Sequence, residues 1–324
     1  MIPVVKPVTL SLVIPTYNRA HLIIETIESA LAQTVSFFEI IVVDDGSTDN
    51  TDYLLSTYQE KIRFFRTENQ GVQAARNRGV AEARSAFVTL CDSDDLFLPD
   101  YVEKITKHLA SSEACNAIYC NFIIFDENKD LSAKLSTAPN AFFADSVCVD
   151  NVYVKIPDLY IKTLTYQPFF PTGLTIRKDF YASLGGFNIA FNGVGSEDWE
   201  FTLRVIEHTD VSLYKTPLVK IRKHSSNDSF DHVRQNIGEA KVLEYALKNH
   251  KTAKSREAII KKSIENRRLL AFDGAYARGD FVLATDLESN LKSMRVTWRF
   301  FLKKMILKLP CSLRNRMWLL TQRS

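Results

Sequence analysis

The stretch that decides the fold is residues 86–95, which read Ala86-Phe87-Val88-Thr89-Leu90-Cys91-Asp92-Ser93-Asp94-Asp95. Its first half is an apolar run with one threonine, which is typical of a strand buried on both faces of a sheet. Its second half places three acids directly after that strand. Loops at the carboxyl ends of parallel strands are where open α/β sheets bind their ligands, so this loop is the first candidate site.

The acidic cluster Asp92, Asp94 and Asp95 requires a positive charge nearby, because like charges at such short spacing repel one another. Carboxylate oxygens suit Mg²⁺ or Mn²⁺, and such an ion can bridge to a diphosphate and neutralise a departing nucleotide. The alternative is a solvated turn that caps a helix opening within residues 96–100, since acids are favourable at that end of a helix.

The segments before this stretch alternate between strand and helix patterns. We expect strands at 8–14, 37–43, 61–65 and 86–90, and helices at about 23–31, 52–58 and 71–84. This alternation predicts an α/β fold with a mainly parallel central sheet and helices on both faces. The polar residues after the first, second and fourth strands should then meet at one edge of the sheet.

The later part of the chain is less regular. Residues 122–167 have weak periodicity, and we expect sheet-extending strands and a long surface loop there. A regular segment at 169–177, helices at about 178–184 and 199–208, a strand at 217–222 and further helices after about residue 229 complete the prediction.

Composition excludes several classes of protein. Of the 324 residues, 46% are hydrophobic and 24% are charged, which is ordinary for a folded globular protein. The five cysteines are scattered without a Cys-x-x-Cys pair, so we expect reduced thiols and no zinc site. We see no signal-peptide pattern and no apolar run near the ~18 residues of a membrane span, so a cytoplasmic location is the expectation.

Two polar loops and one arginine could bind a nucleotide. A carboxylate of Asp44 or Asp45 could accept a hydrogen bond from a pyrimidine N–H or a ribose hydroxyl, although this string could also be an ordinary turn. Tyr17 could stack on a base or be a packed surface aromatic. Arg76 lies one turn into the helix that begins near Gly71. Its guanidinium could reach phosphates there, or it could extend into water while the alkyl part of the side chain packs on the helix.

A later acid pair suggests proton transfer. Glu197 and Asp198 follow a glycine-rich approach at the start of an expected helix. One of them could be a general base that deprotonates an acceptor hydroxyl, or the pair could simply cap the helix. His224, after the strand at 217–222, could ligate the metal or contact phosphate, although a lone histidine also has structural uses.

In this order and spacing, the strings resemble those of the family-2 glycosyltransferases, which have a GT-A fold. The resemblance covers about residues 9–226 and is carried by Val13-Ile14-Pro15-Thr16-Tyr17-Asn18-Arg19, Val42-Val43-Asp44-Asp45-Gly46-Ser47-Thr48-Asp49, Asn69-Gln70-Gly71, Ala75-Arg76-Asn77-Arg78-Gly79, Asp92-Ser93-Asp94-Asp95, Leu184-Gly185-Gly186-Phe187 and Glu197-Asp198-Trp199-Glu200-Phe201. It implies a GT-A domain at 1–228, with a nucleotide-binding half at about 1–120 and an acceptor half at about 121–228, followed by a helical extension at 229–324.

The resemblance also implies roles for the residues above. The nucleotide of a donor that is usually a uridine diphosphate sugar would be lined by Pro15, Tyr17 and Asp45, with Asp44 nearby. Asp92 and Asp94 would form the DxD pair, with Asp94 as the direct metal ligand and Asp95 as a third candidate. Asp198 would be the catalytic base beside Glu197, and His224 would lie near the diphosphate.

We therefore predict an inverting glycosyltransferase that uses Mn²⁺ or Mg²⁺ to move a hexosyl or N-acetylhexosaminyl group from a UDP-sugar to a glycan or lipid-linked glycan of a bacterial envelope. Processive synthases carry a Gln-x-x-Arg-Trp string and membrane spans, and neither is seen here, so we expect single transfer. A nucleotidyltransferase would need a glycine-rich N-terminal loop, and none is seen here. An inactive scaffold would not need to retain both Asp94 and Asp198. We expect no nucleic-acid partner.

The end of the chain is basic. From Ser289 to Ser324 there are nine Lys or Arg and no Asp or Glu, and subtracting nine from the net charge of +3 leaves −6 for residues 1–288. One helical side of this tail is apolar, with Met294, Trp298, Phe301, Met305 and Leu309, and an adjacent side is basic, with Lys292, Arg295, Arg299 and Lys303. The pattern predicts an in-plane helix on the anionic inner face of a membrane. The alternative is a terminal helix that packs on the protein with a solvated basic face.

Overall fold

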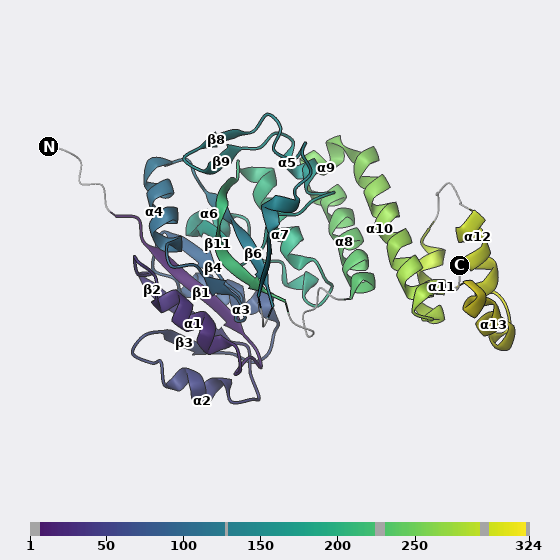
Figure 1. Cartoon of the computed structure of the whole chain (residues 1–324), viewed down its shortest axis with the longest axis horizontal. Helices are drawn as coiled ribbons and strands as arrows, with labels where there is room; N and C mark the ends of the chain where they lie inside the picture. Colours follow the sequence, from purple (N-terminus) through teal and green to yellow (C-terminus); the bar gives the residue numbers. More distant parts are fainter. Residues whose placement is uncertain (1–6, 127–128, 224–230, 292–297, 322–324) are drawn as a thin grey trace. The chain divides into compact units, whose positions relative to one another are not determined.

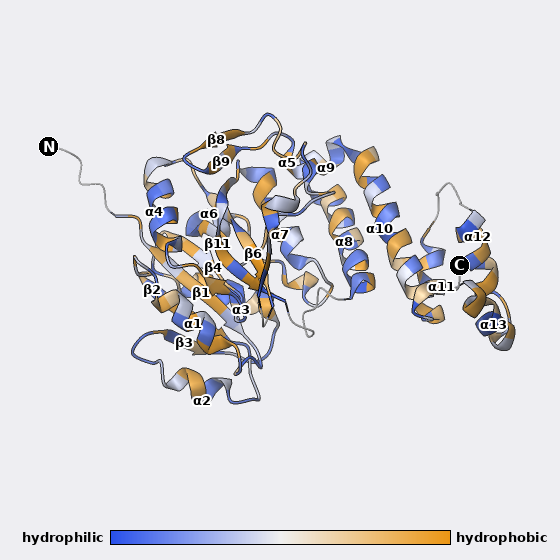
Figure 2. Ribbon diagram, viewed as in Figure 1, coloured by the Kyte–Doolittle hydropathy of each residue, from blue (hydrophilic) through white to orange (hydrophobic). Residues whose placement is uncertain are grey.

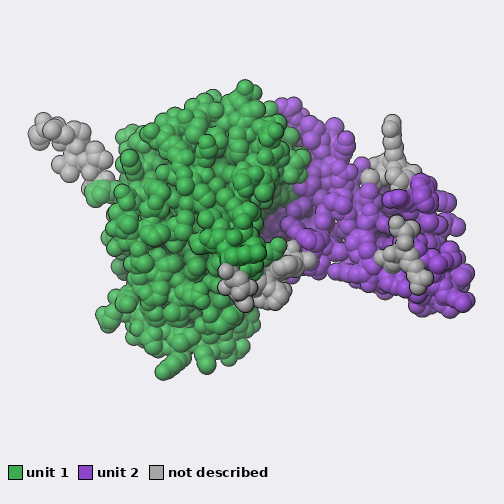
Figure 3. Space-filling model, in the orientation of Figure 1, with its two compact units in different colours: residues 1–193, 198–225 green, residues 194–197, 226–324 purple. Residues whose placement is uncertain are grey.

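The computed structural model describes residues 7–126, 129–223, 231–291 and 298–321. The chain forms two compact units, shown in different colours in Figure 3: unit 1 comprises residues 1–193 and 198–225, and unit 2 comprises residues 194–197 and 226–324.

Unit 1 is built around one large sheet. Its strands are β1 (Leu10–Thr16), β2 (Glu39–Asp44), β3 (Arg63–Arg66), β4 (Phe87–Leu90), β5 (Leu96–Phe97), β6 (Ala117–Phe125), β7 (Asp130–Ala133), β8 (Val147–Val149), β9 (Val152–Lys155), β10 (Thr175–Arg177) and β11 (Ser212–Arg222). Their order is β3-β2-β1-β4-β10-β6-β11-β9-β8, with β5 beside β11 and β7 beside β6 (Figure 1). Strands β3, β2, β1 and β4 are parallel, β10 is antiparallel to both of its neighbours, and β11 is parallel to β6.

Helices cover both faces of this sheet. They are α1 (Ile23–Leu31), α2 (Thr51–Ser56), α3 (Val72–Glu82), α4 (Tyr101–Ser111), α5 (Leu159–Lys162), α6 (Lys178–Ser183) and α7 (Glu197–His208), with short 3₁₀ helices η1 (Lys134–Thr137) and η2 (Ile189–Phe191). Leu12 of β1 packs in one core with residues of α1 and α4, whereas its neighbour Val13 packs in a second core with residues of α3 and α7. Because successive side chains of a strand point to opposite faces, burial on both faces explains the continuous apolar runs, which are visible along the central strands in Figure 2.

The predicted α/β fold is confirmed, and two local predictions are wrong. The helix expected to open within residues 96–100 begins later, because β5 pairs with β11 and α4 starts at Tyr101. The strand expected at 217–222 begins at Ser212, because register shifts on both sides of Pro217 let the strand continue through it. Proline cannot donate a ladder hydrogen bond, so an irregular pairing at Pro217 is expected.

Unit 2 is helical, which confirms the predicted C-terminal extension. Its helices are α8 (His232–Asn249), α9 (Lys251–Ser255), α10 (Glu257–Ala277), α11 (Phe281–Ser289), α12 (Trp298–Leu307) and α13 (Cys311–Thr321). The segment at 194–197 approaches α8 closely, since a Cβ atom on Gly238 would lie 2.2 Å from the carbonyl oxygen of Gly195. In the part of the chain that the structure describes, we find no helix that combines the length and the apolar character needed to cross a membrane.

Candidate active site

The acidic cluster lies at the carboxyl end of β4, as the sequence predicts. Asp92 and Asp94 are partly exposed, whereas Asp95 is buried. Burial, together with the charges of Asp94 and Asp92, raises the pKa of the Asp95 carboxyl well above its ordinary value. The three acids therefore divide into two that reach solvent and one that does not.

Asp95 links the cluster to distant parts of unit 1. Its two carboxylate oxygens accept hydrogen bonds from the Thr172 hydroxyl at 2.5 Å and from the backbone N–H of Arg222 at 2.8 Å. The Thr172 hydroxyl oxygen also accepts from the backbone N–H of Asp92 at 2.9 Å, and the Arg222 Nε–H donates to the carbonyl oxygen of Asp94 at 2.9 Å. These bonds hold the loop in one shape, so Asp95 acts here as a positioning residue. Its role as a metal ligand stays a prediction.

One arginine joins the acidic cluster to the second acid pair. Arg76 of α3 is buried, and its guanidinium donates to Asp92 Oδ1 at 2.6 Å and to Asp198 Oδ1 at 2.8 Å. Asp198 lies 122 positions further along the chain, in the first turn of α7. The fold thus places two predicted site carboxylates, one from each half of unit 1, on the same positive charge.

The turn at Gly185-Gly186-Phe187 supports that arginine from one side. The ring centroid of Phe187 lies 5.1 Å from Arg76 Cζ, an arrangement that favours a cation. Asn77 fixes Phe187 by accepting from its backbone N–H at 2.8 Å and donating to its carbonyl oxygen at 2.9 Å. Gly186 has a φ of +69°, and a Cβ there would lie 2.5 Å from Asn77 Oδ1, so only glycine fits at this point.

The loop after β2 uses its two acids in different ways. Asp44 is buried and accepts from both the backbone N–H and the hydroxyl of Ser47, as in an ordinary Asp turn. Asp45 accepts from the backbone N–H groups of Gln70 at 2.9 Å and Gly71 at 2.7 Å, just before α3 begins. Both carboxylates therefore shape the site, and a direct contact of either with a nucleotide stays a prediction.

The loop after β1 lies beside the same turn. Pro15 is buried within β1, where it is paired with Val43, whereas Tyr17 is exposed. Asn18, which has a φ of +52°, accepts from the backbone N–H of Thr48 at 2.8 Å through its side chain. Tyr17 therefore offers an exposed aromatic ring to a stacking partner.

Glu197 and His224 are the two remaining predicted site residues. Glu197 is the first residue of α7 and belongs to unit 2, whereas Asp198 belongs to unit 1. His224 lies outside the described residues. Within the described ranges, no group of three or more His, Cys, Asp or Glu side chains is arranged to hold a metal ion.

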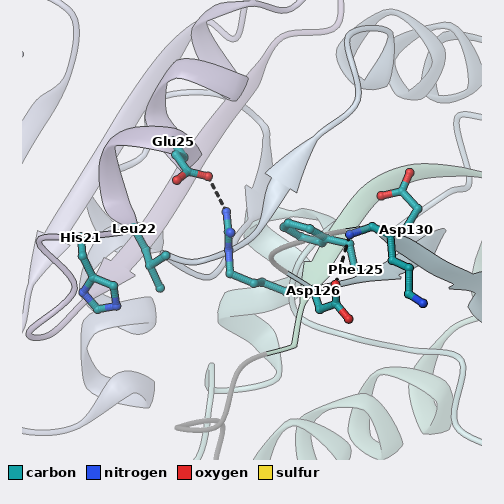
Figure 4. A pocket seen from close by; sticks show the side chains of 8 residues that line it. His21, Leu22, Glu25, Phe125, Asp126 and Asp130 are labelled. Carbon is teal, nitrogen blue, oxygen red and sulfur yellow. Dashed lines mark hydrogen bonds and ion pairs between the residues drawn. The ribbon is translucent and has the colours of Figure 1, made fainter.

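A pocket of about 620 Å³ is lined in part by Arg222, and Figure 4 shows it from close by. Its wall combines residues at and just before the start of α1 with residues of the turn from the end of β6 to the start of β7. Arg222 completes the wall and donates to Glu25 at 2.6 Å. Its lining is His21, Leu22, Glu25, Phe125, Asp126, Lys129, Asp130 and Arg222. None of the predicted site residues lines this pocket, and Arg222 is its link to the acidic cluster.

Sequence reasoning missed three residues that organise the site: Thr172, Arg222 and Asn77. Each acts through a bond to a residue far away in the chain, and such partners are not legible from spacing. The available signal in the sequence was the turn-prone string Pro171-Thr172-Gly173. In the structure, Gly173 has a φ of +87° and lies beside Cys120 and Val219.

Comparison with known proteins agrees with this fold. The family model described as "Glycosyl transferase family 2" matches residues 11–167. A Rickettsia felis protein described as an "Uncharacterized glycosyltransferase" is 30% identical over 233 residues, which is 68% of this chain but only 37% of that protein. YwdF of Bacillus subtilis, also described as an uncharacterized glycosyltransferase, is 28% identical over 73% of this chain and 81% of its own length.

Solved structures share the fold. Residues 1–349 of S. aureus TarS, crystallised in complex with UDP-GlcNAc, match with a TM-score of 0.63 and 16% identity over 98% of this chain and 91% of that one. The fold and the site thus define a GT-A protein with an acidic loop at the carboxyl edge of its sheet. Residues 11–167 thus resemble glycosyl transferase family 2, and the chain shares the fold of that TarS structure.

Proposed function

We propose that this chain is an inverting glycosyltransferase that moves one sugar from a UDP-sugar to a hydroxyl group of a glycan acceptor. The observation that carries the proposal is the buried guanidinium of Arg76, which bonds to Asp92 at 2.6 Å and to Asp198 at 2.8 Å. Donor chemistry at the acidic cluster and proton transfer at Asp198 would then take place around one fixed positive charge.

The loops after β1 and β2 support a nucleotide donor. Tyr17 exposes an aromatic ring on which a base can stack, and Pro15, Asp44 and Asp45 hold the backbone beside it. The TarS structure of the same fold was solved in complex with UDP-GlcNAc. We therefore expect a uridine nucleotide, with a hexosyl or N-acetylhexosaminyl group as the transferred sugar.

The acidic cluster fits a hard divalent cation. Mg²⁺ and similar ions are commonly held by one or two carboxylates together with substrate phosphates and water, so a cage of three protein ligands is not needed. Asp92 and Asp94 are partly exposed and offer such a pair, with Asp94 as the direct ligand and Asp95 and His224 as further candidates. A bound Mn²⁺ or Mg²⁺ would neutralise the charge on the departing diphosphate.

The transfer itself would be a single displacement. Asp198 accepts the proton of the acceptor hydroxyl while that oxygen bonds to the anomeric carbon, and the bond from this carbon to the diphosphate oxygen breaks. Attack opposite the leaving group inverts the configuration at this carbon. Arg76 orients the Asp198 carboxylate through the hydrogen bond at 2.8 Å.

The proposal extends to the acceptor and the location. We place the enzyme in the cytoplasm or on the inner face of the membrane, with a lipid-linked glycan of a bacterial envelope as the acceptor. The relatives named above are bacterial, and fold analogy supplies the rest. The chain spans only 37% of the Rickettsia felis relative, so the activity of that longer protein is not transferred to it.

A thermal-shift screen of the purified full chain tests the donor. UDP-sugars, their GDP and TDP counterparts and free UDP are each added with Mn²⁺ or with EDTA. A ligand that binds only the folded state raises its apparent stability, by about 2.7 kcal/mol at a concentration 100 times its Kd. We expect the largest shift with one UDP-sugar and Mn²⁺. No shift with any sugar nucleotide, or formation of a sugar nucleotide from a nucleoside triphosphate and a sugar phosphate, would contradict the proposal.

A further inference from the structure

The tail helices α12 and α13 are part of the packed core of unit 2. Phe300, Ile306 and Leu307 of α12 are buried in the same core as Phe272 of α10, and the rings of Phe300 and Phe272 lie 5.1 Å apart. On α13, the indole N–H of Trp318 donates to the carbonyl oxygen of Tyr276 at 2.8 Å. One side of the tail therefore packs on the protein. This agrees with the second predicted alternative, a terminal helix that packs on the protein.

The opposite side of α12 is apolar as well, and it is exposed. Trp298 is 70% exposed and Phe301 56%, and Leu302 and Met305 are exposed with them. These four residues are spaced i, i+3, i+4 and i+7, which places them in one stripe along the helix. We call this stripe, Trp298, Phe301, Leu302 and Met305, the apolar stripe. Met294, which the sequence pattern places on this side, lies outside the described residues.

The charges that α12 and α13 themselves carry are all of one sign. Between Trp298 and Thr321 every charged residue is Lys or Arg. Lys303 and Lys304 pair with Asp273 and Glu288 of the same unit. Arg299, Lys308 and Arg316 are exposed, and no ion pair to them is found among the described residues. The surface thus combines a stripe of large apolar side chains with unneutralised positive charge.

We propose that the apolar stripe, with Arg299, Lys308 and Arg316, is a docking surface for an anionic phospholipid bilayer. Tryptophan is favoured at the level of the lipid headgroups, and an apolar stripe flanked by basic residues lies at the boundary between headgroups and acyl chains. Juxtamembrane Lys and Arg are attracted by the negative surface potential of the cytoplasmic leaflet.

Charge favours the bilayer over a second copy of the chain. In a symmetric dimer the same patch meets itself, so the stripe would bring its own unneutralised arginines and lysine together. The bilayer instead supplies the opposite charge over a large area. Because Phe300, Ile306 and Leu307 stay in the core, α12 binds without leaving unit 2. This surface acts independently of the proposed transfer reaction, so either can fail without the other.

Vesicle sedimentation of the full chain tests the docking surface. Vesicles of phosphatidylcholine alone are compared with vesicles that also contain phosphatidylglycerol, at low and high salt. We expect sedimentation only with the anionic vesicles, and weaker sedimentation at high salt. The variant Trp298→Ser/Phe301→Ser should lose at least about tenfold in partitioning, since insertion of the apolar face and attraction of the charges are both required.

Two matched variants complete the test. Arg299→Glu/Lys308→Glu should also lose binding to anionic vesicles, whereas Ile259→Ser removes an apolar side chain that is 45% exposed at the other end of α10 and should bind as the parent does. Melting curves of all variants check that they fold. Absence of binding to anionic vesicles, or a Trp298→Ser/Phe301→Ser variant that binds as well as the parent, would overturn the proposal. So would self-association without lipid that this variant abolishes, because the stripe would then be a contact between copies.

Discussion

The carboxyl edge of the sheet in unit 1 and the tail helices of unit 2 are held in opposite ways. At the sheet edge, polar side chains bond to partners more than 120 positions away, as Arg76 does to Asp198 and Arg222 does to Asp94. In the tail, α12 is held by apolar packing against α10 and keeps a second apolar side in solvent. The first arrangement fixes the positions of charges. The second leaves a surface free for a partner without changing the core.

This difference predicts which changes affect activity and which affect stability or binding. A change at the sheet edge should alter the chemistry, because a displaced charge acts on the reacting groups directly. A change on the outer side of α12 should leave the fold and the turnover in solution as they are. Each variant below has a control of the same residue type at another position, so that position in the fold is the main difference between the two.

The pair Phe300 and Phe301 gives the largest expected contrast in stability. Phe300→Ala removes a ring from the core of unit 2 and should lower the free energy of unfolding by about 3 to 5 kcal/mol. Phe301→Ala removes a ring that is 56% exposed and should change it by less than about 0.5 kcal/mol. Hydrogen exchange of α10 and α12 in the full chain measures both. Equal effects would show that the two sides of α12 are not distinct.

The pair Arg76 and Arg78 tests the shared positive charge on α3. Arg76→Gln leaves Asp92 and Asp198 without their common partner. Losing one side of such a buried charge pair should raise the activation free energy by about 2 to 5 kcal/mol, which lowers kcat/KM by about 30-fold or more. Arg78→Gln breaks an exposed pair with Glu82 on the same helix and should cost no more than about 1 kcal/mol of stability. Steady-state kinetics with the donor found in the screen decides between them. Similar kcat/KM values for Arg76→Gln and Arg78→Gln would remove Arg76 from the account.

Thr172 gives the smallest expected effect. Thr172→Val keeps the shape of the side chain but removes the hydroxyl that bonds to Asp95 and to the backbone of Asp92. It should therefore lower the free energy of unfolding by about 1 to 3 kcal/mol. Thr57→Val, at the exposed end of α2, is the matched control and should change little. Urea unfolding of both variants measures the difference. A Thr172→Val protein as stable as the parent would mean that these bonds do not hold the acidic loop.

The parallel half of the fold was predictable because its signals are local. Alternating strand and helix patterns in the first hundred residues, each ending in a polar loop, identify the sheet and the edge where Asp92 and Asp45 lie. The strands that follow β4 in the chain were less predictable. Strand β11 passes through Pro217 with shifts of register, and β5 has only two residues, so neither shows a full period of two.

The partners within the site were not predictable from the sequence. Spacing shows that Arg76 follows Gly71 by one turn, but it contains no information on a carboxylate 122 positions away. Asp92, Asp94 and Asp95 look alike in sequence, and the fold alone makes one of them buried. The tail pattern correctly placed Trp298, Phe301 and Met305 on one side. It did not reveal that Phe300, Ile306 and Leu307 pack on the other side, because that depends on α10 and α11.

The most direct test of the proposed reaction is the kcat of Asp198→Asn. Asparagine keeps the size of the side chain but cannot take a proton, so kcat should fall by about 100- to 10,000-fold while the donor still binds, as isothermal titration would show. Asp210→Asn, an exposed change just beyond α7, is the control and should keep the kcat of the parent. An Asp198→Asn enzyme that turns over at the rate of the parent would contradict the assignment of Asp198 as the base and the single-displacement mechanism built on it.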